Sequence, residues 1–563
     1  MVNQSIINIA QIFASKGVRN IVLSPGSRSA PLTLAFVRHP GIKTRIVPDE
    51  RSAAFIALGM ALTLKQPVGL ICTSGSAVLN YYPAVAEAFF QNIPLLIVTA
   101  DRPKEWIGQM DGQTIYQTDV YKNHIKKSFE LASDFTHKDS IWHSEKIISE
   151  AIEIAGEEPP GPVHINVPLR EPLYPKNTEK FEYKHNIKLI SSAKSEKVLG
   201  EDEWQNLLTI LSQSKKMLVL AGQGVWNESI KSNLGALSQA VGIPILGDIL
   251  SNLHGIEGVI THPDSFLIRK DDDLFKGLQP DLLITFGLSI ISKNLKLFLR
   301  NNKPVNHWHV QEAGHYADTF QSLTKVLRVS PHYFFGELKE RLSTTGDTNY
   351  KHEWNKLNRE SIEKTDNFFK DKTFSEFEAV QMVLKNLPKK AMVHVANSMP
   401  IRYVNYIGVA EKDVKIWANR GTSGIDGCTS TAMGASFVFQ GTVVLITGDM
   451  AFFYDRNAFW HNYPYDNLRV IVLNNHGGGI FGLIDGPGNL PEREEYFETR
   501  QQLKAENTAK DFGMEYHLCQ SKKELESILP SFFLPHGRSA ILEIETDKSI
   551  NRSVFDEFRQ FMS

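Results

Sequence analysis

The stretch of residues 443–482 constrains the fold of this chain more than any other. A β-branched run at 443–447 ends in a Gly-Asp pair, about four helical turns follow, and a second apolar run at 470–473 ends in an Asn-Asn pair. This order predicts a strand–helix–strand crossover in which the two strands are parallel and adjacent. Asp449 and Asn475 would then lie side by side at the carboxyl ends of neighbouring strands, where open α/β sheets bind ligands.

Polar oxygens and bare backbone meet at this predicted sheet edge. The carboxylate of Asp449 and the amide oxygen of Asn475, beside the glycines at 477–479, suit an oxygen-ligated Mg²⁺ shared with phosphates. An ordinary strand–helix–strand unit in which Asp449 caps the helix is the alternative, and it would be preferred for an isolated Gly-Asp pair. Two polar strand ends, with glycines directly after the second, favour the metal–diphosphate site.

The rest of the chain repeats this alternation of short β-branched runs and helical patterns, which predicts α/β domains built on parallel sheets. Two charged stretches at 175–198 and 343–372 divide the 563 residues. Three parallel-sheet domains are therefore expected, with bounds 1–178, 195–345 and 370–563. The clearest predicted strands are at 21–24, 68–74, 94–101, 163–168, 217–221, 243–246, 282–286, 307–311, 392–396, 414–418, 443–447, 470–473 and 541–544.

Composition and charge exclude several classes of function. The 61 basic and 63 acidic residues leave no basic excess that would favour nucleic acid or an anionic membrane as the main partner. Three distant cysteines without a CxxC pair exclude a disulfide scaffold and a cysteine zinc site. The first residues predict an amphipathic helix ending at Gly17 rather than a signal peptide, and no apolar run reaches the roughly 18 residues of a membrane span. A cytoplasmic protein is expected.

A second cluster of candidate residues follows the first predicted strand. The segment 24–36, SPGSRSAPLTLAF, places a tight turn and then Ser27 and Arg28 at the start of a helix. A helix N-terminus binds anions, and the Arg28 guanidinium can pair with a carboxylate through two hydrogen bonds. Serines that cap the helix and an Arg28 in a surface ion pair explain this segment equally well when it is taken alone.

Glu50 starts a helix that is expected to be buried on most sides. After Asp49-Glu50-Arg51 the chain continues into an almost unbroken run of small and apolar residues. A carboxyl group that loses water in such a place can keep its proton near neutral pH and donate a hydrogen bond to a heteroaromatic nitrogen. The alternative is the common placement of an acidic residue in the first turn of a helix.

Arginines follow three other predicted strands. Arg102, Arg402 and Arg420 should each project at the carboxyl edge of a sheet, and such a set suits a substrate with several carboxylates. Single arginines at the surface are usually solvated, so none is persuasive alone. Other motifs fail, because the glycine run after His476 lacks the GxSxG element of a hydrolase and the chain has neither a Walker A sequence nor HExxH.

Together these motifs resemble one enzyme family. The Gly-Asp pair followed by Asn-Asn is similar to the signature of thiamine-diphosphate enzymes, usually GDG and then NN, except that Met450 takes the third position. The ordered segments SPGSRSAPLTLAF, DERSAAF, ADRP, NRGTSGIDG and NNHGGGIF resemble the 2-succinyl-5-enolpyruvyl-6-hydroxy-3-cyclohexene-1-carboxylate synthases, the MenD family of menaquinone biosynthesis. The resemblance spans the whole chain, and the middle third matches more loosely.

The resemblance implies a three-domain enzyme with a pyrimidine-binding domain, a central Rossmann-like domain and a diphosphate-binding domain. Its cofactors would be thiamine diphosphate and Mg²⁺ or Mn²⁺. The active site would form between the pyrimidine domain of one subunit and the diphosphate domain of another, so a homodimer is the smallest active unit and a homotetramer is common. The implied reaction decarboxylates 2-oxoglutarate and adds the succinyl unit to isochorismate.

The resemblance also assigns roles near the cofactor. Asp449, Asn475 and the carbonyl of Gly477 would hold the metal ion. Glu50 would be the catalytic residue, because its carboxyl would hydrogen-bond to the pyrimidine ring of the cofactor. Further contacts with the cofactor would come from Ile425, an apolar wedge beneath it, and from Gly448 and Met450.

The substrate pocket is implied in the same way. One departure lies beside Gln113, where some members have Asn and this chain has Gly112, so which residue serves which substrate stays open. Lys293 is a weaker candidate from the central domain. The residues implied for the substrates are Ser27, Arg28, Arg102, Gln113, Ser398, Arg402, Arg420, Ile480 and Phe481.

Two other classes of function stay as alternatives. Another thiamine-diphosphate decarboxylase or carboligase, such as an acetolactate-synthase-like enzyme, would share Glu50, Asp449 and Asn475 but would not need the arginines. A non-catalytic homologue that keeps only the fold is the second alternative, and the intact Glu50, Asp449 and Asn475 count against it.

Overall fold

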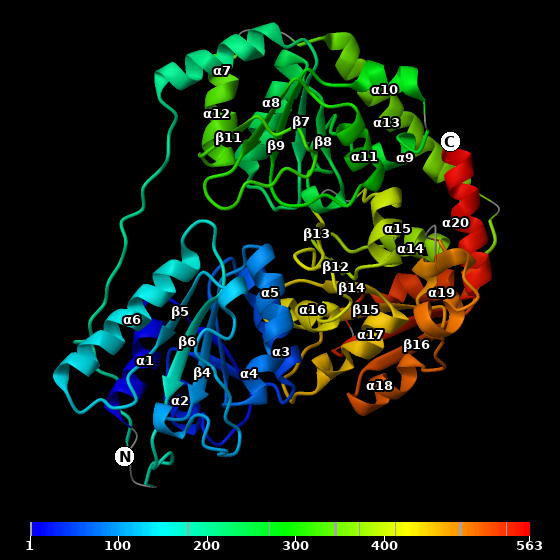
Figure 1. Ribbon diagram of the computed structural model, residues 1–563. Helices are drawn as coiled ribbons and strands as arrows, with labels where there is room; N and C mark the ends of the chain where they lie inside the picture. The colour runs from blue at the N-terminus through cyan, green and yellow to red at the C-terminus, as the bar shows by residue number, and fades with distance from the viewer. Residues whose placement is uncertain are drawn as a thin grey trace.

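The computed structural model describes residues 3–176, 180–269, 271–342, 346–370, 372–410, 413–483, 487–535 and 537–563. It contains three separate sheets, and every strand pairing in them is parallel. Figure 1 shows the first sheet and its helices in blue and cyan, the second in green above them, and the third in yellow to red. The predicted fold class, three parallel-sheet α/β domains, is confirmed.

The first sheet has six strands in the order β2-β1-β3-β4-β6-β5. Alternate residues of its inner strands face two different apolar clusters, since Val22 and Leu70 belong to one and Ile21 and Ile71 to the other. Both faces of the sheet are therefore covered, which explains the near-continuous apolar runs of its strands. The elements are α1 (Gln4–Ser15), β1 (Asn20–Leu23), α2 (Ala30–Val37), β2 (Lys43–Ile46), α3 (Glu50–Leu64), β3 (Val68–Cys72), α4 (Ser76–Asn80), α5 (Tyr82–Phe90), β4 (Leu95–Asp101), η1 (Lys104–Trp106), η2 (Lys122–His124), β5 (Lys127–Glu130), α6 (Lys138–Gly156) and β6 (Val163–Pro168).

The second sheet has five strands in the order β11-β10-β9-β7-β8 and belongs to the central part of the chain. Its two faces are again covered by different apolar clusters, with Val219 in one and Leu218 in the other. The elements are α7 (Glu201–Gln213), β7 (Met217–Ala221), α8 (Glu228–Val241), β8 (Ile245–Gly247), η3 (Ile249–Ser251), α9 (Pro263–Phe266), α10 (Asp272–Leu278), β9 (Leu282–Phe286), α11 (Lys293–Asn301), β10 (Asn306–Val310), β11 (Lys325–Leu327), α12 (Pro331–Arg341) and α13 (Thr348–Phe368).

The third sheet has six strands in the order β13-β12-β14-β15-β17-β16. Its inner strands β14 and β15 pair in parallel from Val443–Leu468 to Gly448–Leu473, as the crossover pattern predicts. The elements are α14 (Glu376–Lys385), β12 (Met392–Val395), α15 (Met399–Ile407), β13 (Lys415–Trp417), α16 (Cys428–Ser436), β14 (Val443–Gly448), α17 (Asp449–Tyr454), η4 (Arg456–Phe459), β15 (Leu468–Asn474), η5 (Gly479–Gly482), η6 (Pro487–Asn489), η7 (Arg493–Phe497), α18 (Ala505–Asp511), β16 (Glu515–Cys519), α19 (Lys522–Phe532), β17 (Ala540–Glu545) and α20 (Lys548–Met562).

The segment between the first two sheets contains no helix or strand at residues 180–200, the part of it that the structure describes up to α7. Two hydrogen bonds attach this segment to the first domain. The hydroxyl of Tyr183 donates to the carbonyl of Ala35 at 2.8 Å, and the hydroxyl of Ser149 donates to the carbonyl of Ile190 at 3.0 Å. The segment thus lies along the first domain before it rises to α7 (Figure 1). The exact domain bounds 1–178, 195–345 and 370–563 stay a prediction.

Four strands are missing from the set predicted by sequence: β2, β5, β11 and β16. All four lie at an edge of their sheet. Most of their residues are only partly buried, so they lack the continuous apolar run that identifies an inner strand. The pattern used for prediction therefore found every inner strand and the edge strands β8 and β13, and it missed the other four edge strands of the described sheets.

The helix predicted after Asp449 is wrong in length. α17 has only six residues, the short 3₁₀ helix η4 follows, and residues 460–467 contain no helix or strand. The buried carboxylate of Asp455 accepts hydrogen bonds from the backbone N–H and the hydroxyl of Ser430, at 2.6 and 2.7 Å. This attachment to α16 explains why the helix stops at Tyr454 instead of continuing for four turns.

The first and third domains pack directly through α3 and α16, whose crossing depends on two glycines. A Cβ added at Gly59 would lie 2.0 Å from the carbonyl oxygen of Thr431. A Cβ added at Gly434 would lie 2.0 Å from the carbonyl oxygen of Ile56. Each helix thus presents bare backbone where the other approaches, and any larger residue at either position must push the two domains apart.

The substitution Gly59→Ala is expected to destabilise the protein. Alanine gains about 1 kcal/mol of helix propensity over glycine, but overpacking at a backbone contact costs about 1–3 kcal/mol or more. Gly235→Ala in α8 is the matched control, because its Cβ would lie 3.7 Å from Ile256 in an ordinary contact, and it should be neutral or stabilising. Urea midpoints measure both; equal midpoints for the two variants would contradict the role of Gly59.

Acid should destabilise the fold through His394 on β12. Burial lowers the pKa of His394 from 6.5 to about 3, so the unfolded chain binds a proton there and the folded chain does not. The contribution of His394 to the free energy of unfolding is therefore fully present above pH 6.5. It decreases as the pH falls, by about 2 kcal/mol between pH 6.5 and pH 5. His394→Leu should weaken this dependence of the urea midpoint, whereas replacing the exposed His315 should leave it unchanged.

Candidate active site

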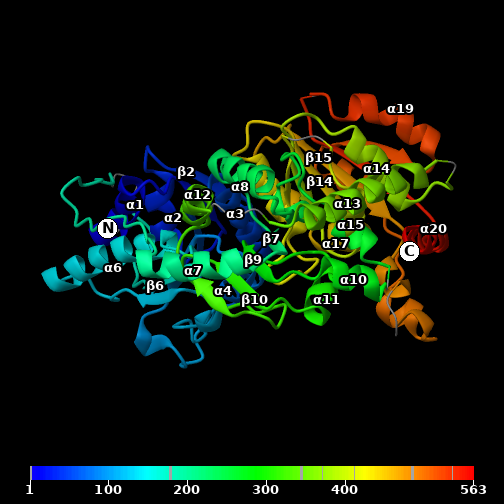
Figure 2. The same cartoon turned by 90° about the horizontal axis from the view of Figure 1, so that it is seen from above.

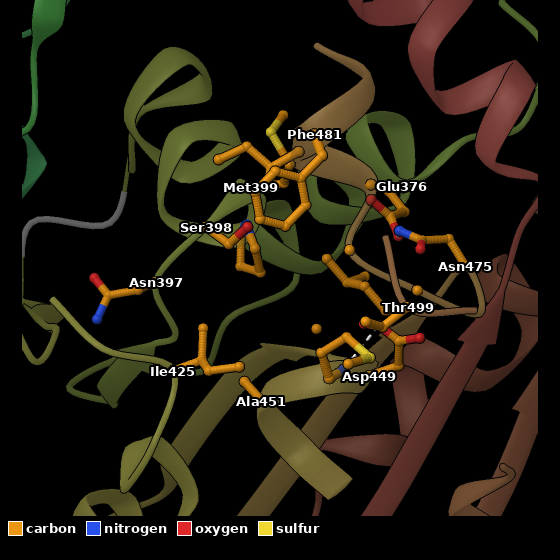
Figure 3. A pocket seen from close by; sticks show the side chains of 18 of the residues that line it. Glu376, Asn397, Ser398, Met399, Ile425, Asp449, Ala451, Asn475, Phe481 and Thr499 are labelled. Atoms are coloured by element: carbon orange, nitrogen blue, oxygen red, sulfur yellow. Dashed lines mark hydrogen bonds between the residues drawn. The ribbon is translucent and has the colours of Figure 1, made fainter. Parts of the chain in front are cut away.

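The carboxyl ends of β14 and β15 border a cavity of about 220 Å³. Asp449 follows β14 and Asn475 follows β15, and both line this cavity together with the glycines at 477–479. Figure 3 shows the side chains converging on it from the sheet edge and from the loops above. Asp449 and Asn475 were expected to meet at the ends of neighbouring strands, and in the structure they line the same cavity.

Asp449 is a buried carboxylate with few partners. Its Oδ1 accepts a hydrogen bond from the backbone N–H of Met450 at 2.8 Å, and its Oδ2 accepts one from the side chain of Gln501 at 2.7 Å. Burial raises the pKa of Asp449 to about 6. A carboxylate that has lost water in this way gains most from a cation beside it, since a cation restores the favourable environment of the charged form.

Asn475 presents an oxygen that lacks a partner. Its Nδ2 donates to Oε1 of Glu376 at 2.6 Å, which fixes the amide. Its Oδ1 is fully buried and accepts no hydrogen bond among the described residues. Burying such an acceptor costs free energy, so an unpaired one beside a cavity indicates a ligand that the cavity receives.

The glycine turn after Asn475 brings bare backbone to the cavity. A Cβ added at Gly477 would lie 2.8 Å from the carbonyl oxygen of Glu498, so the two backbone segments can approach only because this residue is glycine. The N–H of Gly478 donates to the same carbonyl at 2.7 Å. Gly448 and Met450 also line the cavity, directly before and after Asp449.

These groups fit a hard divalent cation. No cluster of three or more His, Cys, Asp or Glu side chains suited to a metal was found in the described parts of the chain. The cavity instead offers the carboxylates of Asp449 and Glu376, one unpaired amide oxygen and exposed backbone, an all-oxygen set. Mg²⁺ is bound in proteins by one or two carboxylates and completes its shell with water and phosphate oxygens. The donor set therefore suits Mg²⁺ or Mn²⁺ with a phosphate-bearing ligand.

Apolar residues form the opposite wall of the cavity. Ile425 lies on the loop before α16, lines the cavity and is 36% exposed. Ile480 and Phe481 of η5 line the cavity from the glycine turn. Ser398 precedes α15 with a left-handed φ of 76° and lines the same space. Such a mix of apolar wall and few polar groups is typical of a cofactor site.

Two of the predicted arginines lie at the rim of this cavity. The side chain of Arg402 donates to the carbonyl of Ser398, and Arg420 donates to Oδ1 of Asn397 at 2.8 Å. Burial and the nearby charge of Arg402 lower the pKa of Arg420, so the two guanidinium groups lie within electrostatic reach of each other. An anionic ligand at this rim would relieve their repulsion.

The central domain adds a cation that the sequence analysis missed. The Lys296 ammonium lies partly buried, and its pKa is lowered by burial and by the charge of Arg420. Lys293, the residue singled out by sequence, is exposed at the start of the same helix. Their three-residue spacing carries no signal that would distinguish them, because only the packing of α11 decides which one turns inward.

The remaining predicted residues gather at the carboxyl edge of the first sheet and do not line the cavity. Arg28 is buried and donates to the carbonyl of Leu169 at 3.1 Å, whereas Ser27 is exposed with its hydroxyl 2.9 Å from that of Tyr174. Arg102 donates to the carbonyl of Gly112 at 2.7 Å. The contacts of Ser27 and Arg28 join the segments that follow β1 and β6, and the contact of Arg102 lies within the segment that follows β4.

Gln113 and Glu50 belong to this second group as well. Gln113 is exposed on the loop after Arg102, with a left-handed φ of 56°, and its backbone lies against Gly75. Glu50 begins α3, and its Oε2 accepts a hydrogen bond from Asn80 at 3.4 Å. Within one chain the structure therefore forms two groups of candidate residues, one at each sheet edge.

The sequence analysis did not predict Glu376. This carboxyl group lines the cavity and interacts with both Asp449 and Asn475. It is 2% exposed at the start of α14, and burial raises its pKa to about 7, with a further contribution from the charge of Asp449. In the sequence it reads as an ordinary acidic residue in the first turn of a helix. Gln501 was missed for a similar reason, since nothing local marks it as a partner of Asp449.

Family comparisons agree with this arrangement of domains. Residues 8–125 match the N-terminal TPP binding domain of thiamine pyrophosphate enzymes, residues 178–395 match the middle domain of thiamine pyrophosphate, and residues 404–544 match the C-terminal TPP binding domain. Most residues that line the cavity lie in the third match, Glu376 lies in the second, and Glu50 and Arg28 lie in the first.

Relatives with curated names cover the whole chain. A 2-succinyl-5-enolpyruvyl-6-hydroxy-3-cyclohexene-1-carboxylate synthase of Cytophaga hutchinsonii is 44% identical over 99% of this chain and 98% of its own length. The protein of that name from Porphyromonas gingivalis is 39% identical over 99% of this chain and 96% of its own length, and the one from Bacteroides thetaiotaomicron is 32% identical over 99% and 98%. With the three matching thiamine pyrophosphate domains, this similarity shows that the chain belongs to the 2-succinyl-5-enolpyruvyl-6-hydroxy-3-cyclohexene-1-carboxylate synthase (MenD) family of thiamine pyrophosphate enzymes.

Proposed function

We propose that the protein is a thiamine-diphosphate- and Mg²⁺-dependent synthase that decarboxylates 2-oxoglutarate and adds the succinyl unit to isochorismate, in menaquinone biosynthesis. The observation that carries this proposal is the cavity at the edge of the third sheet, where the buried Asp449 and the unpaired oxygen of Asn475 offer a metal–diphosphate site. Family membership over the full length supports the choice of reaction.

The diphosphate end of the cofactor would be held by the third domain. Asp449, Asn475 and the carbonyl of Gly477 would ligate Mg²⁺ or Mn²⁺, and Gly448 and Met450 would contact the diphosphate. Ile425 would support the bend between the two rings of the cofactor. When bound, thiamine diphosphate supplies the carbanion chemistry, while the protein orients it and controls its protonation.

The activating carboxyl would come from a second copy of the chain. The cavity is lined by residues from Glu376 to Thr499, all in the third domain, so within one chain it lacks Glu50. We therefore propose a homodimer or homotetramer in which Glu50 of one subunit hydrogen-bonds to the pyrimidine ring held by another. Glu50 would hold the proton that the ring nitrogen needs for its reactive tautomer.

Both substrates carry several carboxylates, which is the chemical reason for the arginines. Arg402 and Arg420 would bind them at the rim of the cavity, beside Ser398. Ser27, Arg28, Arg102 and Gln113 would close the pocket from the first domain of the second subunit. Ile480 and Phe481 would exclude water from the reacting carbon, since they form the apolar wall.

The experiment that tests this proposal compares substrates. Purified protein with thiamine diphosphate and Mg²⁺ is expected to release CO₂ from 2-oxoglutarate and to consume isochorismate in the same reaction. Preference for pyruvate would favour the acetolactate-synthase-like alternative, and no turnover of either acid would favour a non-catalytic homologue.

All three cysteines are free and buried, which supports the proposed cytoplasmic location. Among the described residues, no helix is long and apolar enough to cross a membrane.

A further inference from the structure

We propose that Glu376 is a positioning residue for the metal site: it holds the amide of Asn475 so that the oxygen, and not the NH₂ group, faces the cation. The inference rests on the proposed metal–diphosphate function of the cavity and adds a residue to it. Glu376 itself would contact neither substrate nor the reacting atoms, so it acts through Asn475 and is not a catalytic residue.

The contact between these two side chains is close and buried. Oε1 of Glu376 accepts a hydrogen bond from Nδ2 of Asn475 at 2.6 Å. Glu376 is only 2% exposed and lines the same cavity as Asn475. Figure 3 shows the carboxylate and the amide pointing toward one another at one side of the cavity.

Glu376 is itself held by two further hydrogen bonds. Its Oε2 accepts a hydrogen bond from the hydroxyl of Tyr403 at 3.2 Å, and its backbone N–H donates to Oδ1 of Asn551 at 2.9 Å. The next residue, Phe377, packs against the Tyr403 ring with centroids 5.2 Å apart. The carboxylate therefore has a fixed position from which it can orient a neighbour.

Orientation matters because an asparagine amide has two nearly isosteric ends. A rotation of the amide by half a turn would exchange the oxygen and the NH₂ group, and only the oxygen can bind a cation. Both oxygens of Glu376 accept hydrogen bonds, Oε1 from Asn475 and Oε2 from Tyr403, so the NH₂ end of the amide is the one that faces this carboxyl group. The consequence is visible in the cavity, where Oδ1 of Asn475 is left buried and without a partner among the described residues.

A second glutamate of the same helix provides a contrast. Glu378 is 1% exposed, and its carboxylate pairs with Lys522 at 2.7 Å. It is not among the residues that line the cavity. Glu376 and Glu378 therefore share helix, side chain and burial, but only the first contacts a proposed metal ligand.

The test measures the dissociation constant of Mn²⁺ by electron paramagnetic resonance in the presence of thiamine diphosphate, and the Mg²⁺ concentration that half-saturates cofactor binding. Glu376→Met, which removes the acceptor at similar length, is expected to raise both by about 10–100-fold, the usual loss when a group that orients a metal ligand is removed. Glu376→Gln should have a smaller effect, because its amide oxygen still accepts from Asn475. Glu378→Gln should leave both values unchanged.

A reversed pair separates orientation from general damage to the fold. Asn475→Asp alone places two carboxylates against each other and should weaken Mn²⁺ binding. The double variant Glu376→Gln/Asn475→Asp restores one donor and one acceptor with the direction of the hydrogen bond reversed, and it should recover Mn²⁺ binding to within a few-fold of the unmodified protein. A residue that only stabilises the helix would give no such rescue.

Failure of the metal site and failure of the positioning role give different experimental results. If the unmodified protein binds thiamine diphosphate without any dependence on Mg²⁺, the proposed metal site fails. If it shows that dependence, but Glu376→Met binds Mn²⁺ as tightly as Glu378→Gln, the positioning role is overturned. Absence of rescue in the double variant, with both single variants folded, would overturn it as well.

Discussion

Replacing Asp449 by alanine is expected to abolish the Mg²⁺-dependent binding of thiamine diphosphate. Asp449 directly follows β14 and lines the same cavity as the unpaired oxygen of Asn475. It is the only carboxylate that we propose as a ligand of the cation, so its loss removes the one full negative charge among the ligands. Removing a group that merely orients a metal ligand typically costs 10–100-fold in metal affinity, and loss of the ligand itself should exceed about 100-fold. Fluorescence titration with cofactor at several Mg²⁺ concentrations measures the effect.

Two controls show whether such a loss is local. Asp511→Ala removes an exposed carboxylate of the same domain, paired with Arg456 at 3.1 Å, and should bind the cofactor normally. The metal-free Asp449→Ala protein should unfold at a temperature no lower than the unmodified one, because burial already disfavours the charged form of this residue. Undiminished Mg²⁺-dependent binding in Asp449→Ala would place the metal elsewhere.

The inner strands, whose two faces are both covered, could all be predicted from the sequence, and so could the edge strands β8 and β13. β9 (Leu282–Phe286) and β6 (Val163–Pro168) consist of fully buried residues, and their predicted bounds match the observed ones. β2 and β16 lie at sheet edges and nearly all of their residues are partly buried or exposed, so their sequences carry too weak a pattern. The helix after Asp449 failed for another reason, since the contact of Asp455 with Ser430 that ends it joins residues 25 positions apart.

The site was predictable where strand order alone decides what meets. Asp449 and Asn475 follow adjacent strands, so their proximity required only the crossover rule. Glu376 lies 99 residues before Asn475 in the sequence, and Lys296 depends on how α11 packs against the third domain. No periodicity connects such pairs, because tertiary packing and not local pattern brings them together.

The separation of the candidates into two groups is also a matter of packing. Asp49 and Arg51, which flank Glu50, bind the third domain of the same chain through Asn457 and Tyr454. These contacts anchor the start of α3 without placing Glu50 among the residues that line the cavity. The roles of Glu50 and of the arginines of the first domain therefore stay predictions that depend on a second subunit.

The substitution Glu50→Gln is expected to preserve cofactor binding and to remove most turnover. Glutamine keeps the size and hydrogen-bonding capacity of the side chain but has no carboxyl proton to share with a ring nitrogen. Loss of a positioned acid–base group typically lowers the rate by about 10²–10⁴-fold. The half-saturating concentrations of thiamine diphosphate and Mg²⁺ should change little, since the diphosphate site is formed by the third domain. Single-turnover release of CO₂ from 2-oxoglutarate measures the rate.

Glu228→Gln decides between this role and a purely structural one. Like Glu50, Glu228 is the first residue of a helix whose preceding side chain accepts hydrogen bonds from the first turn. If Glu50 served only the helix dipole, both substitutions would lower the urea midpoint by a similar small amount and leave turnover intact, since such charges contribute about 0.3–1 kcal/mol each. Loss of turnover in Glu50→Gln alone, with cofactor still bound, is the result that only the proposed contact with the pyrimidine ring explains.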